Sequence, residues 1–222
     1  MIKIKSPGRI CFFGDHQDYL GLPVISGTID RYVYIKASKI ESSFFEINLL
    51  DFNESLKIEF KNDPKKIAPS DYFRAGLYVL EKNGIIPNQG YQIQINGDLP
   101  INAGLSSSSS LVVGWIKFLV KAFAVGRKID NLQIAKWAVE TEVDFFNQAG
   151  GIMDQYTISI GGLMMIDTSK KTYEKLEGSL GPLLVIDSGE SKNTQGVLSN
   201  AKVNAQEAIK HVKKSNKDFD LT

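Results

Sequence analysis

The feature that most constrains the fold is a strand, a small-residue loop and an apolar helix in immediate succession. Residues 91–95 alternate apolar and polar side chains, as a half-buried strand does. The loop that follows contains Gly104 and the serine run 106–110, and residues 111–123 are mostly apolar over a helical length. At a helix start the backbone N–H groups have no intrahelical partners, so they and the serine hydroxyls can bind an anion. The pattern therefore predicts a phosphate-binding loop.

This loop differs from the common nucleotide-binding motifs. It lacks the Gly-Lys-Ser/Thr of a Walker A loop and the Gly-x-Gly-x-x-Gly turn of dinucleotide-binding folds. A serine run can also be a helix N-cap or a flexible linker, because serine favours both. Its position between a strand and an apolar helix favours a phosphate loop, in which one serine hydroxyl could also ligate Mg²⁺.

The remaining pattern predicts a single α+β domain. No internal repeat, heptad register or low-complexity linker divides the 222 residues. Strands are predicted at 2–5, 10–13, 24–26, 31–38, 44–50, 56–61, 91–95, 162–167, 171–176 and 183–187. Helices are predicted at 70–83 with Ser70 as N-cap, at 111–123, from the N-cap Asp130 towards Asn147, and at 194–213.

Composition narrows the class of protein. A net charge of +1 gives no field that would attract nucleic acid or an anionic membrane. The single cysteine, Cys11, excludes an internal disulfide, and the first residues lack the apolar stretch of a signal peptide. The apolar run 111–125 is interrupted by Lys117 and Lys121 and is shorter than the roughly 20 residues that span a bilayer. We therefore expect a cytoplasmic protein without nucleic-acid or membrane partners.

A second candidate site is a polar turn near the N-terminus. Asp15, His16, Asp18 and Tyr19 lie within five positions, after a strand-like segment. Carboxylates and an imidazole on a rigid turn can exchange hydrogen bonds with the hydroxyls of a polyol. The alternative is an ordinary polar hairpin turn. A metal site at His16 is disfavoured because the other histidine, His211, lies in the basic C-terminal region.

A third candidate site consists of two carboxylates separated by a glycine break. Glu142 lies near the end of a predicted helix, and Asp154 follows the pair Gly150-Gly151. Acidic residues near helix ends are usually solvated or act as caps. Asp154, however, lies within an apolar segment, where a carboxylate is expected to be paired or functional.

Together the three segments resemble the galactokinase branch of the superfamily of galactokinase, homoserine kinase, mevalonate kinase and phosphomevalonate kinase (GHMP kinases). Pro7-Gly-Arg9 with Gly14-Asp-His-Gln-Asp-Tyr19 resembles the first family signature. Gly104-Leu-Ser-Ser-Ser108 resembles the phosphate loop, and Gly151-Ile-Met-Asp-Gln155 resembles the galactokinase-type catalytic segment. The resemblance implies an α+β fold: the two-layer, mixed-sheet N-terminal domain of GHMP kinases, like domain 2 of ribosomal protein S5.

The resemblance also implies a role for each matched residue. Arg9 and Asp154 would be catalytic, with Asp154 accepting the proton of an anomeric hydroxyl and Arg9 screening the transferred phosphoryl charge. The reaction would be transfer from ATP to the C1 hydroxyl of galactose or a related monosaccharide, without a covalent enzyme intermediate. Asp15, His16 and Asp18 would bind the sugar. The ATP phosphates would be bound by Gly104, Leu105, Ser106, Ser107 and Ser108. Ser108 and Glu142 would ligate Mg²⁺.

Two departures from the family pattern leave alternatives open. Asp15 and Gln17 replace the usual Glu and Thr of the signature, so a different sugar is conceivable, as is a non-sugar alcohol such as mevalonate. Nothing after Asp187 resembles the third, glycine-rich family signature. The expectation is therefore one N-terminal domain over residues 1–222 without the C-terminal domain, as in a gene fragment or one half of a split enzyme. Such a chain would turn over slowly or not at all, and could form a homodimer or act as a silent sugar sensor.

Overall fold

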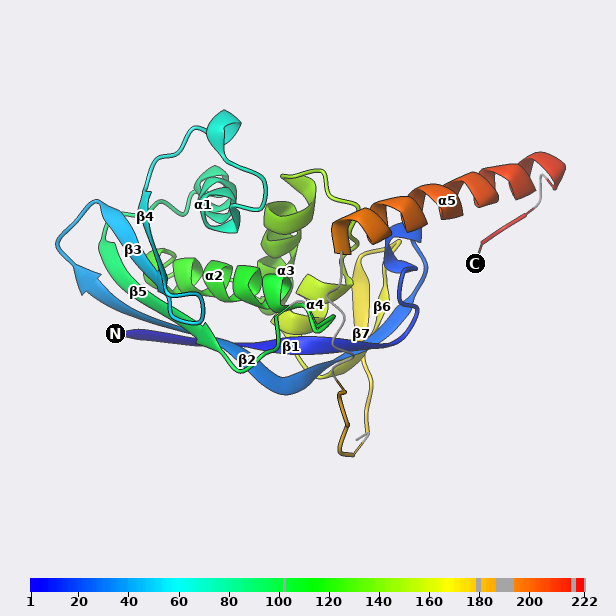
Figure 1. The fold of residues 1–222 in the computed structure, drawn as a ribbon, viewed down its shortest axis with the longest axis horizontal. Coiled ribbons are helices and arrows are strands. Elements are labelled where there is room, and N and C mark those ends of the chain that lie inside the picture. The colour runs from blue at the N-terminus through cyan, green and yellow to red at the C-terminus, as the bar shows by residue number, and fades with distance from the viewer. Residues whose placement is uncertain (102, 179–180, 187–193, 217–218, 222) are drawn as a thin grey trace.

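A seven-stranded mixed sheet forms one layer of the molecule, and helices α1 to α4 cover one of its faces (Figure 1). The computed structural model describes residues 1–101, 103–178, 181–186, 194–216 and 219–221; of residues 194–199 it describes only the course of the helix. The two-layer α+β fold with a mixed sheet is as the sequence predicted.

The strands are β1 (Ile2–Phe13), β2 (Val24–Ile40), β3 (Phe44–Leu49), β4 (Glu54–Glu59), β5 (Gly90–Gly97), β6 (Leu163–Asp167) and β7 (Thr172–Lys175). The α-helices are α1 (Tyr72–Lys82), α2 (Ser107–Phe123), α3 (Asn131–Val139), α4 (Met153–Ile160) and α5 (Thr194–Ser215). Short helical turns lie at Asp18–Leu20 and Pro64–Lys66, and a π-helical segment at Glu140–Asp144 continues α3. Every helix of the described residues is too short or too polar to cross a lipid bilayer.

The long strand β2 organises the sheet. One edge of β2 pairs with β1 over most of its length. The other edge pairs with β6 at residues 24–27 and with β5 at residues 33–40. The parallel pair β3–β5 makes the sheet mixed, because the other pairs are antiparallel. As an edge strand, β1 carries Arg9 to the sheet rim and delivers the polar turn after Phe13.

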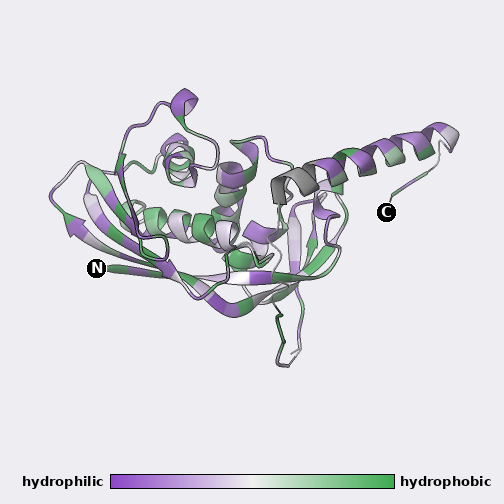
Figure 2. Ribbon diagram, viewed as in Figure 1, coloured by the Kyte–Doolittle hydropathy of each residue, from purple (hydrophilic) through white to green (hydrophobic). Residues whose placement is uncertain are grey.

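Helix α2 lies between the sheet and the outer helices (Figures 1 and 2), and most of its residues from Ser109 to Leu119 are buried, which explains its largely apolar central part. Trp115 is fully buried, and its indole N–H donates to the carbonyl oxygen of Phe73 on α1 at 3.0 Å. Gly76 permits this approach, because a Cβ there would lie 2.8 Å from the Trp115 ring. The α1–α2 packing fixes the direction of α2, and with it the position of its N-terminus.

Several predicted boundaries were wrong for identifiable reasons. The segments 2–5 and 10–13 form one strand, because Pro7 is tolerated at a sheet edge where a register shift absorbs it. Helix α2 begins at Ser107, since the serines after Ser106 are helical. The N-cap of α1 is Asp71, whose carboxylate accepts from the N–H of Arg74, and not Ser70.

Two elements were missed and one predicted strand is absent. The sequence did not predict the π-helical segment 140–144 or α4, which begins within the Gly-Ile-Met-Asp-Gln segment. Residues 183–186 do not form a strand; residue 187, the end of that prediction, lies outside the described residues. The predicted helix N-cap at Asp130 is confirmed, because its carboxylate accepts from the N–H of Gln133 at 2.7 Å.

Candidate active site

The serine loop rests directly on β1. The N–H of Arg9 donates to the carbonyl oxygen of Leu105 at 3.2 Å. A Cβ at Gly8 would lie 3.0 Å from the carbonyl oxygen of Leu105, so glycine at this position gives the loop room to approach β1. Leu105 is buried in the core. Its predicted role as a phosphate ligand is therefore limited to its backbone, while its side chain anchors the loop.

Arg9 and Asp154 form a two-pronged ion pair between β1 and the first turn of α4. Arg9 Nε donates to Asp154 Oδ1 at 2.6 Å, and Arg9 Nη2 donates to Asp154 Oδ2 at 3.0 Å. Arg9 Nη1 donates to the carbonyl oxygen of Gly104 at 2.9 Å. Burial works to lower the pKa of Arg9, but the adjacent Asp154 carboxylate outweighs it and raises that pKa. The guanidinium thus stays charged and links the strand, the loop and α4.

The serine loop turns one hydroxyl onto the same carboxylate. Ser106 is the N-cap of α2 in a left-handed conformation (φ 59°), and its side chain caps no backbone N–H. Its hydroxyl donates instead to Asp154 Oδ2 at 2.5 Å, and Ser109 lies 3.5 Å from the same oxygen. The reading of the serine run as a simple side-chain N-cap is therefore wrong. The backbone N–H groups at the start of α2 have no side-chain acceptor from Ser106 and adjoin the pocket.

Glu142 is buried behind the serine loop, in the π-helical segment. Its carboxylate accepts from the side-chain amide of Gln155 at 2.7 Å, and the hydroxyls of Ser109 and Ser108 also bond to it. Burial raises the pKa of Glu142, the serine and glutamine hydrogen bonds oppose this, and the charge of Asp154 adds to it. A π-helical turn within a longer helix is a common feature of functional sites.

These residues fit a magnesium ion bound together with a nucleotide. The described residues contain no group of three or more His, Cys, Asp or Glu that could hold a metal by themselves. Mg²⁺ is typically held by one or two carboxylates together with substrate phosphates. Glu142 and the exposed Ser108 adjoin the pocket and offer two oxygen ligands of that kind.

The polar turn lies on the other side of Asp154. Within this turn, the hydroxyl oxygen of Tyr19 lies 3.4 Å from His16 Nδ1, and His16 Nε2 lies 3.8 Å from Asp15 Oδ2. The side chain of Asp15 is 61% exposed and that of His16 is 33% exposed, so both can contact a ligand.

Asp18 is hydrogen-bonded to the start of α4, the helix that carries Asp154. Its carboxylate accepts from the backbone N–H groups of Tyr19 and of Met153, the first residue of α4. Burial and then the charge of Asp154 raise the pKa of Asp18, while the two N–H bonds oppose that rise. A Cβ at Gly151 would lie 2.0 Å from Asp18 Oδ2, so the glycine leaves the space in which this carboxylate sits.

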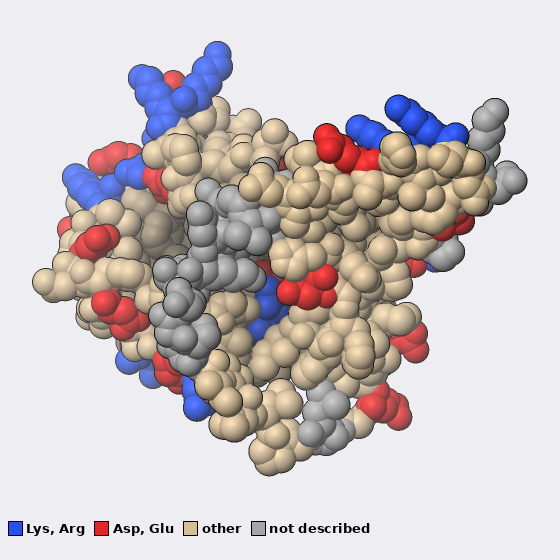
Figure 3. Space-filling view, turned by 45° about the vertical axis from the view of Figure 1, so that its right-hand side comes forward, with Lys and Arg blue, Asp and Glu red and all other residues tan. Residues whose placement is uncertain are grey.

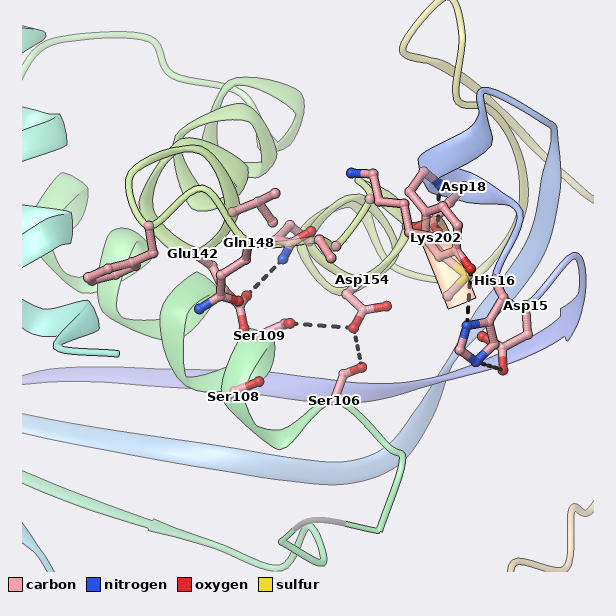
Figure 4. A pocket seen from close by; sticks show the side chains of 18 of the residues that line it. Asp15, His16, Asp18, Ser106, Ser108, Ser109, Glu142, Gln148, Asp154 and Lys202 are labelled. Atoms are coloured by element: carbon pink, nitrogen blue, oxygen red, sulfur yellow. Dashed lines mark hydrogen bonds and ion pairs between the residues drawn. The ribbon is translucent and has the colours of Figure 1, made fainter. Parts of the chain in front are cut away.

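All three segments line one pocket of about 910 Å³. In Figure 4, Asp154 lies between Glu142 on one side and Asp15, His16 and Asp18 on the other, with Ser106 below it. Figure 3 shows acidic and basic side chains together in a hollow beside α5. Of the residues predicted for the site, Leu105 does not line the pocket; the others do, and are Arg9, Asp15, His16, Asp18, Gly104, Ser106, Ser107, Ser108, Glu142 and Asp154.

The sequence did not single out every pocket residue. Lys202, Val203 and Gln206 enter the pocket from α5, on one face of that helix. Lys202 Nζ lies 5.8 Å from the centre of the Tyr19 ring, and points into the pocket in Figure 4. A spacing of three to four residues on a helix was the available signal, but only the fold shows that this face meets the polar turn.

Comparison with known families matches two parts of the chain. Residues 71–162 match the GHMP kinases N terminal domain, and residues 2–39 match the galactokinase galactose-binding signature. The first match covers the serine loop, Glu142 and Asp154, and the second covers Arg9 and the polar turn.

Individual relatives agree with these matches. The galactokinase of Pyrococcus furiosus is 34% identical over 176 residues, which is 78% of this chain and 49% of the relative. The galactokinase of Thermotoga maritima is 33% identical over 184 residues, 80% of this chain and 51% of the relative. The chain thus spans about half the length of the curated relatives that it matches.

Solved structures share the fold. Lactococcus lactis galactokinase complexed with galactose superimposes with a TM-score of 0.80 at 23% identity, covering 99% of this chain and 58% of that one. Methanococcus jannaschii mevalonate kinase superimposes with a TM-score of 0.67 at 22% identity, and the match covers 94% of this chain and 72% of that one.

Proposed function

The chain contains the N-terminal domain of a GHMP kinase of the galactokinase-like branch, and from this premise we propose that its pocket phosphorylates a sugar hydroxyl with ATP. The favoured acceptor is the anomeric C1 hydroxyl of galactose or of a related monosaccharide. The observation that supports this best is the convergence on Asp154, which bonds to Arg9 and to Ser106 of the phosphate loop. A hydroxyl placed on this carboxylate would lie next to phosphate groups bound by the loop.

In the proposed reaction, the chain positions two substrates and stabilises charge. Asp154 accepts the proton of the attacking hydroxyl or orients it, since a carboxylate within hydrogen-bond reach can act as a general base. Arg9 pairs with Asp154 and adds positive charge beside the transferred phosphoryl group. The N–H groups at the start of α2 bind the ATP phosphates.

Ser108 and Glu142 would hold the magnesium ion, which supplies charge neutralisation at the phosphates when bound. The fully buried Glu142 carboxylate is costly without a cation, and this favours the assignment. The Ser109 hydroxyl lies within hydrogen-bond reach of both the Glu142 and the Asp154 carboxylates, so the proposed glutamate ligand and the proposed proton acceptor adjoin the same side chain.

We assign the remaining sugar hydroxyls to the polar turn. Asp15 and Asp18 would accept hydrogen bonds from them, and His16 can donate or accept. Because Asp18 is fixed by the N-terminus of α4, the distance between this subsite and Asp154 is set by the fold. The match to the galactose-binding signature over residues 2–39 supports a sugar at this position.

A second candidate is a small alcohol that carries a carboxylate, such as mevalonate. Lys202 lines the pocket, yet it forms no ion pair with another described residue. Arg9 is already bonded to Asp154 and Gly104, so Lys202 is the cation that can receive an acidic substrate group. The fold shared with a mevalonate kinase is compatible with this candidate.

A substrate panel separates the candidates. The chain is incubated with ATP, Mg²⁺ and one of several monosaccharides or mevalonate, and ADP release is measured. Where this chain turns over, even slowly, galactose or another monosaccharide should support the ADP release, and phosphorus NMR of the product should show an anomeric phosphate. Turnover with mevalonate alone would favour the second candidate.

Binding is measured in parallel, because the relatives extend well beyond the matched region and turnover can depend on it. Calorimetric titration with each sugar, with and without a non-hydrolysable ATP analogue, tests the pocket itself. Sugar binding without turnover in any form of the protein would indicate a silent sugar sensor. Absence of binding to both sugars and nucleotide would contradict the proposal.

A further inference from the structure

On the basis of the proposed function, we infer that Gln155 is a positioning residue of the cation site. Its side-chain N–H holds the Glu142 carboxylate in place, and its amide oxygen accepts a hydrogen bond from the hydration shell of the bound Mg²⁺. The roles proposed above for Asp154, Ser108 and Glu142 assign no function to Gln155.

The first observation is the buried hydrogen bond between Gln155 and Glu142. Gln155 Nε2 donates to Glu142 Oε2 at 2.7 Å, and the two residues are only 3% and 5% exposed. A carboxylate so deeply buried requires hydrogen-bond donors to remain charged. The bond from Gln155 therefore fixes the orientation of the proposed oxygen ligand.

The second observation concerns the oxygen atom of the Gln155 side-chain amide. Gln155 Oε1 is buried and has no hydrogen-bond partner among the described residues. Buried polar atoms nearly always have a partner, so an exception calls for a ligand or a water molecule. The other two such atoms, on Ser6 and Tyr156, belong to residues that do not line the pocket, whereas Gln155 does. The residue that carries this unsatisfied acceptor therefore adjoins the site where a ligand is expected.

The chemistry of Mg²⁺ matches this acceptor. Magnesium ions give up their water reluctantly and keep several water ligands when they bind to carboxylates and phosphates. Each retained water presents O–H donors that need acceptors nearby. An amide oxygen beside Glu142 is such an acceptor, and outer groups that support metal ligands contribute substantially to metal affinity.

The position of Gln155 gives α4 two functions within one turn. Asp154 points towards Arg9 and Ser106, and its neighbour Gln155 contacts Glu142. The same helix turn thus carries the proposed proton acceptor and the support of the cation ligand. This arrangement keeps the attacking hydroxyl and the cation in a fixed relation.

The test measures cation binding rather than turnover. Mn²⁺ replaces Mg²⁺, and its free concentration is followed by electron paramagnetic resonance in the presence of the 222-residue chain and a non-hydrolysable ATP analogue. Gln155→Met keeps the approximate length of the side chain and removes both hydrogen-bonding atoms. We expect its Mn²⁺ dissociation constant to rise by about 10- to 100-fold, the range found for outer supports of metal ligands. Gln155→Leu should show a similar loss, because it also lacks both hydrogen-bonding atoms.

Ser159→Ala is the matched control, because it removes a buried side-chain hydrogen bond from the same helix, to the carbonyl oxygen of Asn131. It should leave Mn²⁺ affinity unchanged, and sugar binding should be unchanged in the Gln155 variants. A folded Gln155→Met or Gln155→Leu variant that binds Mn²⁺ like the original chain would overturn the inference while leaving the proposed function intact. Failure of the original chain to bind Mn²⁺ and nucleotide would contradict the nucleotide part of the proposed function, and the inference with it.

Discussion

Asp154 is the residue on which the proposed chemistry depends. It receives two hydrogen bonds from Arg9 and one from Ser106, so its carboxylate is fixed between the strand and the serine loop. Asp154→Asn keeps the size of the side chain and removes the proton acceptor. We expect turnover to fall by about 10²- to 10⁴-fold, the usual contribution of general acid–base catalysis, with sugar affinity largely retained.

Asp144, which is exposed in the π-helical segment, provides the control for this substitution. Asp144→Asn should leave both turnover and sugar binding as they are. The measurement is ADP release with the substrate that the panel identifies, together with calorimetric sugar titration. Equal turnover in the Asp154→Asn variant and the original protein would exclude Asp154 as the proton acceptor.

Gly151 is predicted to control the sugar subsite through Asp18. A Cβ at this position would lie 2.0 Å from the Asp18 carboxylate, so Gly151→Ala should displace that carboxylate and lower sugar affinity by about tenfold or more. Gly150→Ala is the matched control, because its Cβ would meet Val143 at an ordinary 3.5 Å. Calorimetry with both variants measures the effect. An equal loss in both would show that the segment tolerates no side chain, independently of Asp18.

Asp18 should make stability depend on pH in a defined direction. Its pKa in the folded chain is raised by burial and by Asp154, so the folded state binds the proton more tightly than the unfolded state. The stability contribution of Asp18 is therefore greatest in acid and declines as pH rises through its folded-state pKa. Asp18→Asn removes this decline while it weakens sugar binding.

The measurement compares chemical unfolding of the two proteins between about pH 4 and pH 7. The variant should gain stability relative to the original chain as pH rises, and the difference should level off above the folded-state pKa. A relative loss of stability towards neutral pH would mean that the Asp18 charge is favourable in the folded chain.

The residue types of the site could be read from the sequence, but their hydrogen-bond partners could not. The polar turn, the serine loop and Asp154 each stood out by composition, and all line the same pocket. The contact of the left-handed Ser106 with Asp154 depends on how α2 and α4 meet. The buried contact between Gln155 and Glu142 depends on how α4 packs against the π-helical segment after α3. No local pattern within these helices contains that information.

At the scale of elements, two substitutions at the start of α1 test which residue caps this helix. Asp71 accepts from the N–H of Arg74 and also pairs with the Arg74 side chain, whereas Ser70 has φ 64° and lies outside the cap. Asp71→Ala should lower the free energy of unfolding by about 1 kcal/mol, the typical value of an N-cap. Ser70→Ala should change it by less than about 0.5 kcal/mol.

Chemical denaturation of the two variants measures both values. The reverse order of effects would place the cap at Ser70, as the sequence alone suggested. Both are good N-cap residues. They could not be ranked from the sequence, because the choice depends on the backbone conformation at 70 and on the side chain of Arg74.

The elements that escaped prediction are those whose local pattern contradicts their structure. Helix α4 follows two glycines and has only eight residues, so its start resembles a loop. The π-helical segment continues α3 without a sequence break. By contrast, α2 and β5 carry a clear apolar run and a clear alternation, and both were predicted in type. Tertiary packing decides the conformation where the local signal is weak.

At the scale of the whole molecule, the sheet brings the three segments together. β1 presents Arg9 at its edge, α2 crosses that sheet with its N-terminus towards Arg9, and α4 packs against β1 and β2 with Asp154 in its first turn (Figure 1). Helix α5 adds Lys202 at the rim of the pocket. The order and spacing of the motifs indicated this convergence through family resemblance, whereas the contribution of α5 depends on the three-dimensional arrangement.

The most direct test of this account is a crystal structure of the chain with galactose, or the sugar that the panel identifies, and a non-hydrolysable ATP analogue with Mg²⁺. The account predicts a sugar hydroxyl hydrogen-bonded to Asp154, with its oxygen about 3–3.5 Å from the terminal phosphorus held at the start of α2. A sugar bound away from Asp154, or a nucleotide bound away from the serine loop, would contradict it.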